Sequence, residues 1–290
     1  MGERDPTETA TPTADEILRL DDDRFGPESV AIVTGAASGI GRATAAALAA
    51  NGLTVVGTDV DEAGLSETAA LADDLADALD AGGAVRTAVA DLTDDDAVER
   101  VVETAAGAGD LRYVANIAGV QHIDPIESFP METYDTMQDV MVRAPLLLTK
   151  LALPHVRATD DGVGCVGNMC SIHGHVATQD KVGYITAKFG LRGLTQSIAA
   201  EGEGKIRAFT VSTSYVSTPL VTGQIPDTAR ERDITEEAVV EDVMLGGSRV
   251  KEMMRPIEVA NLFAFGFSKH ARHLNGGDLL FDGGHVPTYE

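Results

Sequence analysis

The stretch that decides the fold is Val30-Ala31-Ile32-Val33-Thr34-Gly35-Ala36-Ala37-Ser38-Gly39-Ile40-Gly41. It reads as a short apolar strand, a glycine-rich turn and the start of an alanine-rich helix. Glycines at such a turn let the backbone approach a pyrophosphate, and the helix N-terminus presents free N–H groups to that anion. Taken alone, the glycines are equally compatible with a tight strand-to-helix turn.

Strand and helix patterns alternate along the chain from Ser29 onward, which predicts βαβ units and a parallel sheet covered by helices on both faces. The fold class is therefore α/β, a single Rossmann-type doubly wound domain over residues 29–290. The expected strands are Val30–Val33, Thr54–Thr58, Ala84–Val89, Leu111–Ala115, Gly164–Met169, Ile206–Val211 and Asp278–Phe281. The expected helices are Ile40–Ala50, Leu65–Leu79, Asp94–Ala106, Met131–Val156, Lys181–Glu201 and Pro256–Ser268.

Two segments lie outside this alternation. Residues 1–28 are rich in Asp, Glu, Thr and Pro, and we expect a mobile or loosely docked extension with one short helix around Ile17–Leu20. Residues 219–252 are irregular and partly helical.

The composition is strongly acidic, with 46 Asp and Glu against 22 Lys and Arg, a formal charge of −24. This balance disfavours nucleic acid and anionic membranes as partners, because both require clustered cations. The acid-rich, lysine-poor composition resembles that of proteins from salt-loving archaea, where charge serves solubility. Cys165 and Cys170 suggest neither a disulfide framework nor a metal site, and we expect a soluble cytoplasmic protein.

An acid follows the second expected strand at Asp59, 24 positions after Gly35. A carboxylate at this place accepts hydrogen bonds from adenosine ribose hydroxyls and repels a 2′-phosphate, so it favours NAD over NADP. The simpler interpretation is a strand-end acid in an acidic protein. The glycine turn at the preceding strand makes the nucleotide interpretation the stronger one.

Further motifs follow the later strands. Asn116-Ile117-Ala118-Gly119 comes after the fourth strand and Ser171 after the fifth, while Tyr184 and Lys188 share one helix face at a spacing of four. With the G-x3-G-x-G turn, these motifs resemble the short-chain dehydrogenase/reductase family, whose pattern is T-G-x3-G-x-G, N-N-A-G, Ser and Tyr-x3-Lys. The resemblance covers most of residues 29–290 and implies an NAD-dependent oxidoreductase.

The resemblance implies a catalytic role for Ser171, Tyr184 and Lys188. A tyrosine pKa, ordinarily about 10, falls beside an ammonium and a cationic nicotinamide, so that Tyr184 can exchange a proton with the substrate oxygen. Ser171 can donate a hydrogen bond to the same oxygen. The implied cofactor contacts are Gly35, Ser38, Gly39, Ile40, Gly41, Asp59, Asp91, Leu92, Asn116, Tyr184, Lys188, Val216 and Thr218.

Within the family, residues 119–127, 171–174, 181–184 and 218–221 are most similar to enzymes that interconvert 3-hydroxybutyrate and acetoacetate. That similarity implies substrate binding by Gln121, His173, Lys181 and Gln224, beside the aromatic wall of Tyr215. The residue types support it independently, because an ammonium with neutral donors suits a carboxylate. The predicted reaction is reversible, NAD-dependent oxidation of 3-hydroxybutyrate.

The chain departs from the family pattern at two places. Met141 occupies the position of an Asn that orders a water beside the lysine, and methionine has no useful hydrogen-bonding group. Gln138, one turn away, is a possible substitute. Thr213-Ser214 replaces a Pro-Gly pair, and Tyr215 replaces a tryptophan of the hydroxybutyrate enzymes.

The sequence is also compatible with two other functions. One is a short-chain reductase of another oxo compound such as acetoacetyl-CoA, which Asp59 and the scarcity of cations disfavour. The other is a catalytically weakened NAD-binding regulator, supported by Met141 and Thr213-Ser214 and opposed by the intact Ser171, Tyr184 and Lys188. The family resemblance also implies a homotetramer and a mobile substrate lid over residues 219–252, with Gln224 reaching in on closure.

Overall fold

The computed structural model describes residues 11–286 and 288 of the chain. The strands among these residues form one seven-stranded sheet. The strand order is β3-β2-β1-β4-β5-β6-β7, and every neighbouring pair is parallel. The order reverses between β1 and β4, which is the crevice where doubly wound sheets bind ligands. The predicted Rossmann-type α/β fold is confirmed.

The observed elements follow the predicted alternation closely. The strands are β1 Ser29–Thr34, β2 Thr54–Asp59, β3 Ala84–Val89, β4 Asp110–Asn116, β5 Gly164–Met169, β6 Ile206–Thr213 and β7 Gly277–Phe281. The main helices are α1 Gly39–Ala50, α2 Glu62–Ala78, α3 Asp95–Ala106, α4 Met131–Gln138, α5 Ala144–Ala158, α6 Val182–Glu201 and α10 Pro256–Phe267. No helix among the described residues is long and apolar enough to cross a membrane.

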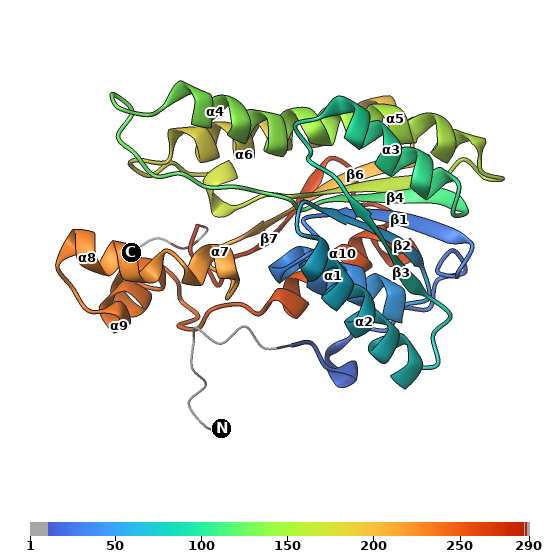
Figure 1. Cartoon of the computed structure of the whole chain (residues 1–290), viewed down its shortest axis with the longest axis horizontal. Coiled ribbons are helices and arrows are strands. Elements are labelled where there is room, and N and C mark those ends of the chain that lie inside the picture. The colour runs from blue at the N-terminus through green and yellow to red at the C-terminus, as the bar shows by residue number, and fades with distance from the viewer. Residues whose placement is uncertain (1–10, 287, 289–290) are drawn as a thin grey trace.

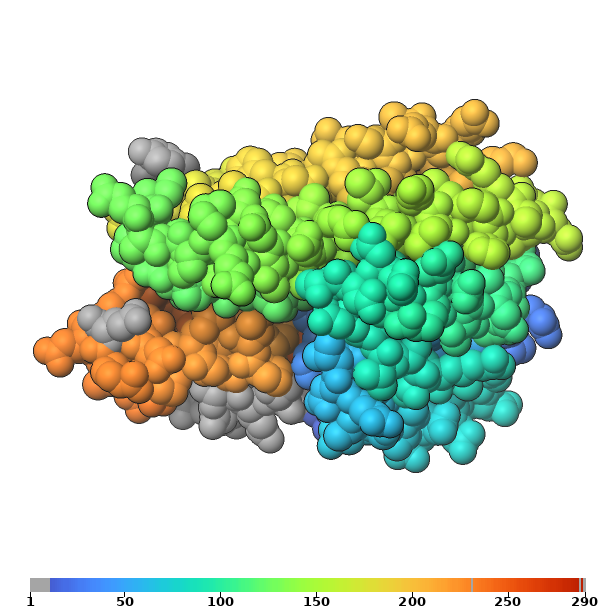
Figure 2. Space-filling view, turned by 45° about the horizontal axis from the view of Figure 1, so that its top comes forward, coloured from blue at the N-terminus to red at the C-terminus, as the bar shows by residue number. Residues whose placement is uncertain are grey.

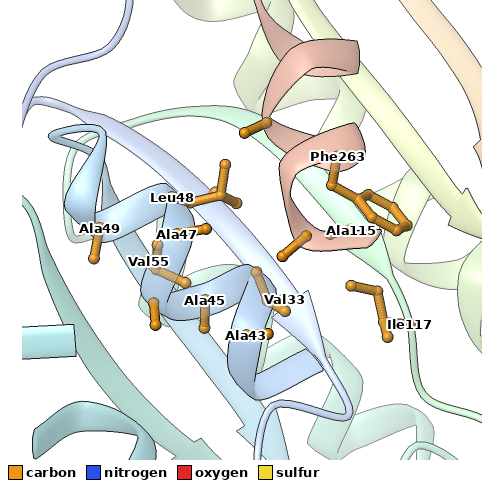
Figure 3. Packing of buried hydrophobic residues seen from close by; sticks show 14 of the residues in the cluster. Val33, Ala43, Ala45, Ala47, Leu48, Ala49, Val55, Ala115, Ile117 and Phe263 are labelled. Carbon is orange, nitrogen blue, oxygen red and sulfur yellow. The ribbon is translucent and has the colours of Figure 1, made fainter. Parts of the chain in front are cut away.

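Helices cover both faces of the sheet, with α1, α2 and α10 on one side and α3 to α6 on the other (Figure 1). The alanines of α1 allow this helix to lie close to β1, β2 and α10. Figure 3 shows Ala43, Ala47 and Leu48 of α1 in the cluster that also contains Phe263 of α10. Because small side chains permit close backbone approach, this packing holds the start of α1 firmly against the sheet.

The segment of residues 11–28 is more extensively docked than expected. Ile17 is buried in the core, the Arg255 guanidinium pairs with Glu16, and Phe25 packs edge-on against Tyr113. The helix expected around Ile17–Leu20 is wrong: a 3₁₀ turn, η1, spans Ala14–Glu16 instead. The Thr13 N–H donates to the Glu16 carboxylate and caps that turn, whereas Ile17 is already extended and residues 18–20 are not helical. Residues 1–10 of the predicted extension lie outside the described residues.

Asn51, directly after the last residue of α1, forms hydrogen bonds with this docked segment. Its buried amide donates to the Leu18 carbonyl at 3.1 Å and accepts from the Leu20 N–H at 2.9 Å. We expect Asn51→Ala to lower the free energy of unfolding by about 2 kcal/mol, because the Leu18 carbonyl and the Leu20 N–H both lose their hydrogen-bond partner. Urea unfolding of the variant tests this, and an unchanged midpoint would show that the segment contributes nothing to stability.

The long helical region predicted from Met131 is divided by a π-helical turn, η2, over Asp139–Arg143 between α4 and α5. The segment predicted to be a lid, residues 219–252, contains short helices: α7 Pro219–Thr222, α8 Ile225–Arg232, α9 Glu236–Ala238 and the π-helical η4 Val239–Met244. They lie beyond the carboxyl ends of the strands and have a small apolar core of their own (Figure 1). The lid therefore packs as a unit beside the sheet.

Candidate active site

A cavity of about 470 Å³ opens at the carboxyl edge of the sheet, where β1 and β4 diverge. The residues predicted for cofactor binding and catalysis line it together, with the exception of Asn116. The lining includes Gly35, Ser38, Gly39, Ile40, Gly41, Asp59, Asp91, Leu92, Ser171, Tyr184, Lys188, Val216 and Thr218. Sequence positions separated by more than 180 residues thus converge on one space.

The glycine turn requires glycine for steric reasons that the structure makes explicit. Gly35 has φ +68°, and a Cβ there would lie 2.9 Å from the Ala118 Cα. A Cβ on Gly41 would lie 2.0 Å from the Gly35 carbonyl oxygen. The turn therefore brings the N-terminus of α1 against the end of β1, with its backbone facing the cavity.

Asp59 lies at the end of β2 and lines the same cavity. One carboxylate oxygen accepts the Ala37 N–H at 3.1 Å, and the other accepts the Val60 and Asp61 N–H groups. The acid therefore braces the glycine turn as well as facing the cavity. Both interpretations of Asp59, as a structural acid and as a nucleotide contact, are compatible with this position.

The Asn116–Gly119 segment is tied to the glycine turn through Thr34. The Thr34 hydroxyl accepts the N–H groups of Ile117 and Ala118 at 2.9 and 3.0 Å. Because Ile117 acts through its backbone here, its departure from the family Asn leaves this contact intact. The Asn116 amide donates to Asn168 instead of lining the cavity.

Ser171, Tyr184 and Lys188 meet at the inner end of the cavity. The Lys188 ammonium is buried, donates to the Met169 carbonyl at 2.8 Å and lies 5.1 Å from the Tyr184 ring centroid. Burial lowers the Lys188 pKa to about 8. Burial also raises the Tyr184 pKa, which a hydrogen bond with Ser171 partly offsets. The chain by itself therefore keeps this phenol protonated. The lowered pKa predicted from the sequence also depends on the positive charge of a bound nicotinamide, so a phenolate needs an additional positive charge nearby.

Met141 fills the place of the family Asn within the π-helical turn. Its side chain is fully buried, and both the Met141 sulfur and the Lys188 Nζ flank Gly119. The alternative that Gln138 substitutes is not supported, because its amide donates to the Gly183 carbonyl and the Thr186 hydroxyl. An apolar thioether therefore lies near Lys188 at the position where the family pattern has an amide.

This burial predicts an alkaline decline in activity. As pH rises through the folded-state Lys188 pKa of about 8, the ammonium that favours the phenolate loses its charge, so kcat/KM should fall above that pH. Met141→Asn places a polar amide beside Lys188 and should move this decline to higher pH. Rate profiles of both proteins between pH 6 and about 10 measure the shift. Superimposable profiles would contradict the assigned role of Met141.

The five residues predicted to bind substrate lie beside the cavity instead of on its lining. The His173 ring meets the Tyr184 ring edge-on at 6.0 Å, and burial and the Lys181 charge lower the His173 pKa to about 4. The Gln121 amide donates to the Gln224 side-chain oxygen at 3.3 Å, which links the loop after β4 to the lid. Figure 2 shows the lid (orange) directly below the segment around residues 120–140 (green).

Two residues that the sequence analysis missed belong to this neighbourhood. The Ser214 hydroxyl lies 3.2 Å from His285 Nδ1, so the polar residue that replaces the family glycine has gained a partner near the chain end. Burial raises the pKa of Tyr215, and the positive charge of Arg232 opposes that rise. Arg232 lies seven positions after Ile225, and this helical spacing was the signal that could have placed both residues on one side of a helix. His285 follows the pair Gly283-Gly284, and no pattern there predicts a contact with Ser214.

Comparison with known proteins agrees with this geometry. A family model described as enoyl-(acyl carrier protein) reductase matches residues 35–285. The chain belongs to the short-chain dehydrogenase/reductase family of oxidoreductases, whose members use a nicotinamide cofactor.

Individual relatives share most of the chain. A D-beta-hydroxybutyrate dehydrogenase from Rhizobium meliloti (strain 1021) is 34% identical over 88% of this chain and 97% of its own length. A cis-4-hydroxycyclohexanecarboxylate dehydrogenase from Sinomonas cyclohexanicum is 35% identical over 89% of this chain and 97% of its own. The crystal structure of a levodione reductase superposes with a TM-score of 0.83 at 30% identity, covering 91% of this chain and all of the other.

Proposed function

We propose that this protein is an NAD-dependent dehydrogenase that interconverts 3-hydroxybutyrate and acetoacetate. The observation that carries the proposal is the edge-on contact of His173 with Tyr184, with Lys181 at the start of the same helix, one turn before Tyr184, together with the Gln121–Gln224 contact. These groups set a carboxylate-binding cluster next to a proton-exchanging phenol. A substrate with an acid group near a secondary alcohol fits both at once.

The cavity suits a nicotinamide dinucleotide. The glycine turn has no room for a Cβ at Gly41 and presents backbone at the cavity, as close approach to a pyrophosphate requires. Gly35, Ser38, Gly39, Ile40 and Gly41 would hold the phosphates, and Asp59 the adenosine ribose. Asp91 and Leu92 would flank the adenine, with Val216 and Thr218 at the nicotinamide end. The Asp59 carboxylate favours NAD, and when bound this cofactor accepts the hydride from the alcohol.

Three side chains of the protein complete the chemistry. Ser171 donates a hydrogen bond to the substrate oxygen and holds it in place. Tyr184 takes the alcohol proton during oxidation and returns it during reduction. Lys188, charged below about pH 8, stabilises the phenolate that this exchange requires.

The relatives support an acid substrate. Two of them are named for the oxidation of a hydroxy acid, 3-hydroxybutyrate in one and 4-hydroxycyclohexanecarboxylate in the other. The structural neighbour is named for a ketone, levodione, and a further relative for a hydroxysteroid, and neither name denotes an acid. The Lys181 ammonium therefore distinguishes the two substrate classes, since only a carboxylate gains from a charge-assisted contact.

Replacing Lys181 tests this assignment. Lys181→Gln should raise KM for 3-hydroxybutyrate by about 10- to 100-fold with little change in kcat, because a charged hydrogen bond is lost. KM for a neutral secondary alcohol should not move. Lys150→Gln, an exposed lysine on α5, is the matched control. Assays with both enantiomers in concentrated KCl measure these values, and turnover restricted to neutral alcohols would refute the proposal.

A further inference from the structure

A polar cluster lies between the last strand of the sheet and the turn that carries Ser171. Asp278 of β7 is in register with Thr210 of β6, and one oxygen of its carboxylate accepts the hydroxyls of Thr210 and Ser212 at 2.5 and 2.8 Å. The other oxygen lies 2.9 Å from Nε2 of His175. The side chains of Asp278 and His175 are only 14% and 17% exposed. Three protein groups therefore surround this carboxylate, as a carboxylate largely removed from water requires.

The cluster contains the residue types of an Asp–His–Ser catalytic triad but not its geometry. The same ring nitrogen of His175, Nε2, faces both Asp278 at 2.9 Å and the Ser212 hydroxyl at 3.2 Å. In a triad the acid bonds one ring nitrogen and the serine bonds the other, which lets the imidazole take the serine proton. The Ser212 hydroxyl here donates to Asp278 and is completely buried. The cluster therefore connects segments of the chain and does no chemistry of its own.

His175 ends the short turn that holds two of the residues assigned to the site. This 3₁₀ turn, η3, spans Ile172–Gly174, with Ser171 before it and His175 after it. The N–H of His173 donates to the Ser171 hydroxyl oxygen at 3.2 Å, and the N–H of His175 closes the turn on the Ile172 carbonyl at 2.8 Å. Because Ser171 and His173 belong to one hydrogen-bonded turn, a shift of His175 moves both.

The two ends of this turn are held by different parts of the domain. At the start, the Cys170 N–H donates to the Val211 carbonyl of β6 at 2.8 Å. At the end, the His175 imidazole reaches across to Asp278 of β7. Arg192 of α6 adds a hydrogen bond to the Gly174 carbonyl at 2.8 Å. The side chain of His175 therefore ties the end of the turn to the edge of the sheet.

We propose that His175 is a positioning residue, which through its contact with Asp278 fixes the place of the Ser171 hydroxyl. The part that concerns His173 rests on the proposed hydroxy-acid substrate, whereas the part that concerns Ser171 applies to any alcohol oxidised at this site. Without the contact the turn is free to shift. The Ser171 hydroxyl then donates less well to the substrate oxygen, because such a donor acts only when it is held in place before the reaction.

Kinetics of His175→Leu, with His155→Leu as the matched control, test this role. His175→Leu should lower kcat about tenfold for 3-hydroxybutyrate and for a neutral secondary alcohol, and should also raise KM for 3-hydroxybutyrate through His173. The affinity and stoichiometry of NAD binding should match the wild type, which shows that the protein is folded. His155 is an exposed histidine of α5, and its variant should keep the wild-type kcat. Equal kcat values in the two Leu variants would overturn the proposal.

Two further variants show whether His175 acts through Asp278. His175→Gln retains an N–H donor and should recover most of the lost kcat. In an Asp278→Ala background, His175→Leu should cause no further loss, because both changes remove the same contact. A Gln variant as slow as His175→Leu, or a second tenfold loss in the Asp278→Ala background, would contradict the assigned contact.

Amide hydrogen exchange separates this inference from the proposed reaction. The amides of His173 and His175 are hydrogen-bonded within the turn, and in His175→Leu they should exchange at least about tenfold faster, with β1 and α10 unchanged. That result in an enzyme that oxidises neutral alcohols but not 3-hydroxybutyrate would refute the reaction and retain the positioning role. Unchanged exchange in the turn, or faster exchange throughout the protein, would overturn the role of His175.

Discussion

Tyr184→Phe should lower kcat by about 1,000-fold or more, the largest effect on the chemical step of any single change in this site. The phenol lines the cavity together with Ser171 and Lys188, and the Lys188 ammonium lies 5.1 Å from the centroid of its ring. Removing its hydroxyl leaves the ring, its edge-on contact with His173 and the apolar contacts of the helix in place. The change should therefore abolish turnover without changing the fold.

Cofactor binding and a second tyrosine provide the controls. NAD affinity of Tyr184→Phe, measured by calorimetric titration, should stay within a few-fold of the wild type. Tyr134→Phe changes a half-buried tyrosine of α4 that does not line the cavity, and it should keep full activity. If Tyr184→Phe retains a tenth or more of the wild-type kcat, another group carries the proton and the assignment is wrong.

Gly41→Ala should weaken NAD binding by about 100-fold, equivalent to about 3 kcal/mol, because the added methyl group has no space. Its Cβ would lie 2.0 Å from the Gly35 carbonyl oxygen and 3.1 Å from the Ala36 nitrogen. Both atoms belong to the backbone of the turn, so relief requires the turn to open. Opening it moves the N–H groups that would meet the pyrophosphate.

Gly193→Ala is the matched control for this substitution. Gly193 lies inside α6, and a Cβ there meets nothing within 4 Å. Alanine is the better helix former by about 1 kcal/mol, so this variant should be as stable as the wild type or more stable. Calorimetric titration with NAD compares the two variants. Wild-type affinity in Gly41→Ala would show that the turn does not hold the cofactor phosphates.

Much of the fold was predictable because its signals are local. Strand Gly164–Met169 and strand Ala84–Val89 were predicted with their observed limits, since each is an apolar or β-branched run between turn residues. The convergence of Gly35, Ser171 and Tyr184 on one cavity also followed from sequence, because parallel strands end at one edge of the sheet.

The remaining features depend on contacts between distant segments. Docking of residues 11–28 rests on Asn51 and on Arg255, positions that no local pattern connects with Glu16 or Leu18. The pKa of Tyr184 depends on how deeply the helix face is buried, and spacing does not reveal burial depth. Gln138 was a reasonable substitute for the family Asn by helical spacing, but the π-helical turn and the neighbouring α6 give it other partners.

The most direct test of the account is the initial rate of reduced-cofactor formation from D-3-hydroxybutyrate in concentrated KCl, with NAD and NADP compared at equal concentration. Tyr184, Lys181 and Asp59 together predict rapid formation of NADH, at least about tenfold slower reaction with NADP, and no reaction in the Tyr184→Phe variant. Turnover of neutral alcohols without any turnover of 3-hydroxybutyrate, or a preference for NADP, would contradict it.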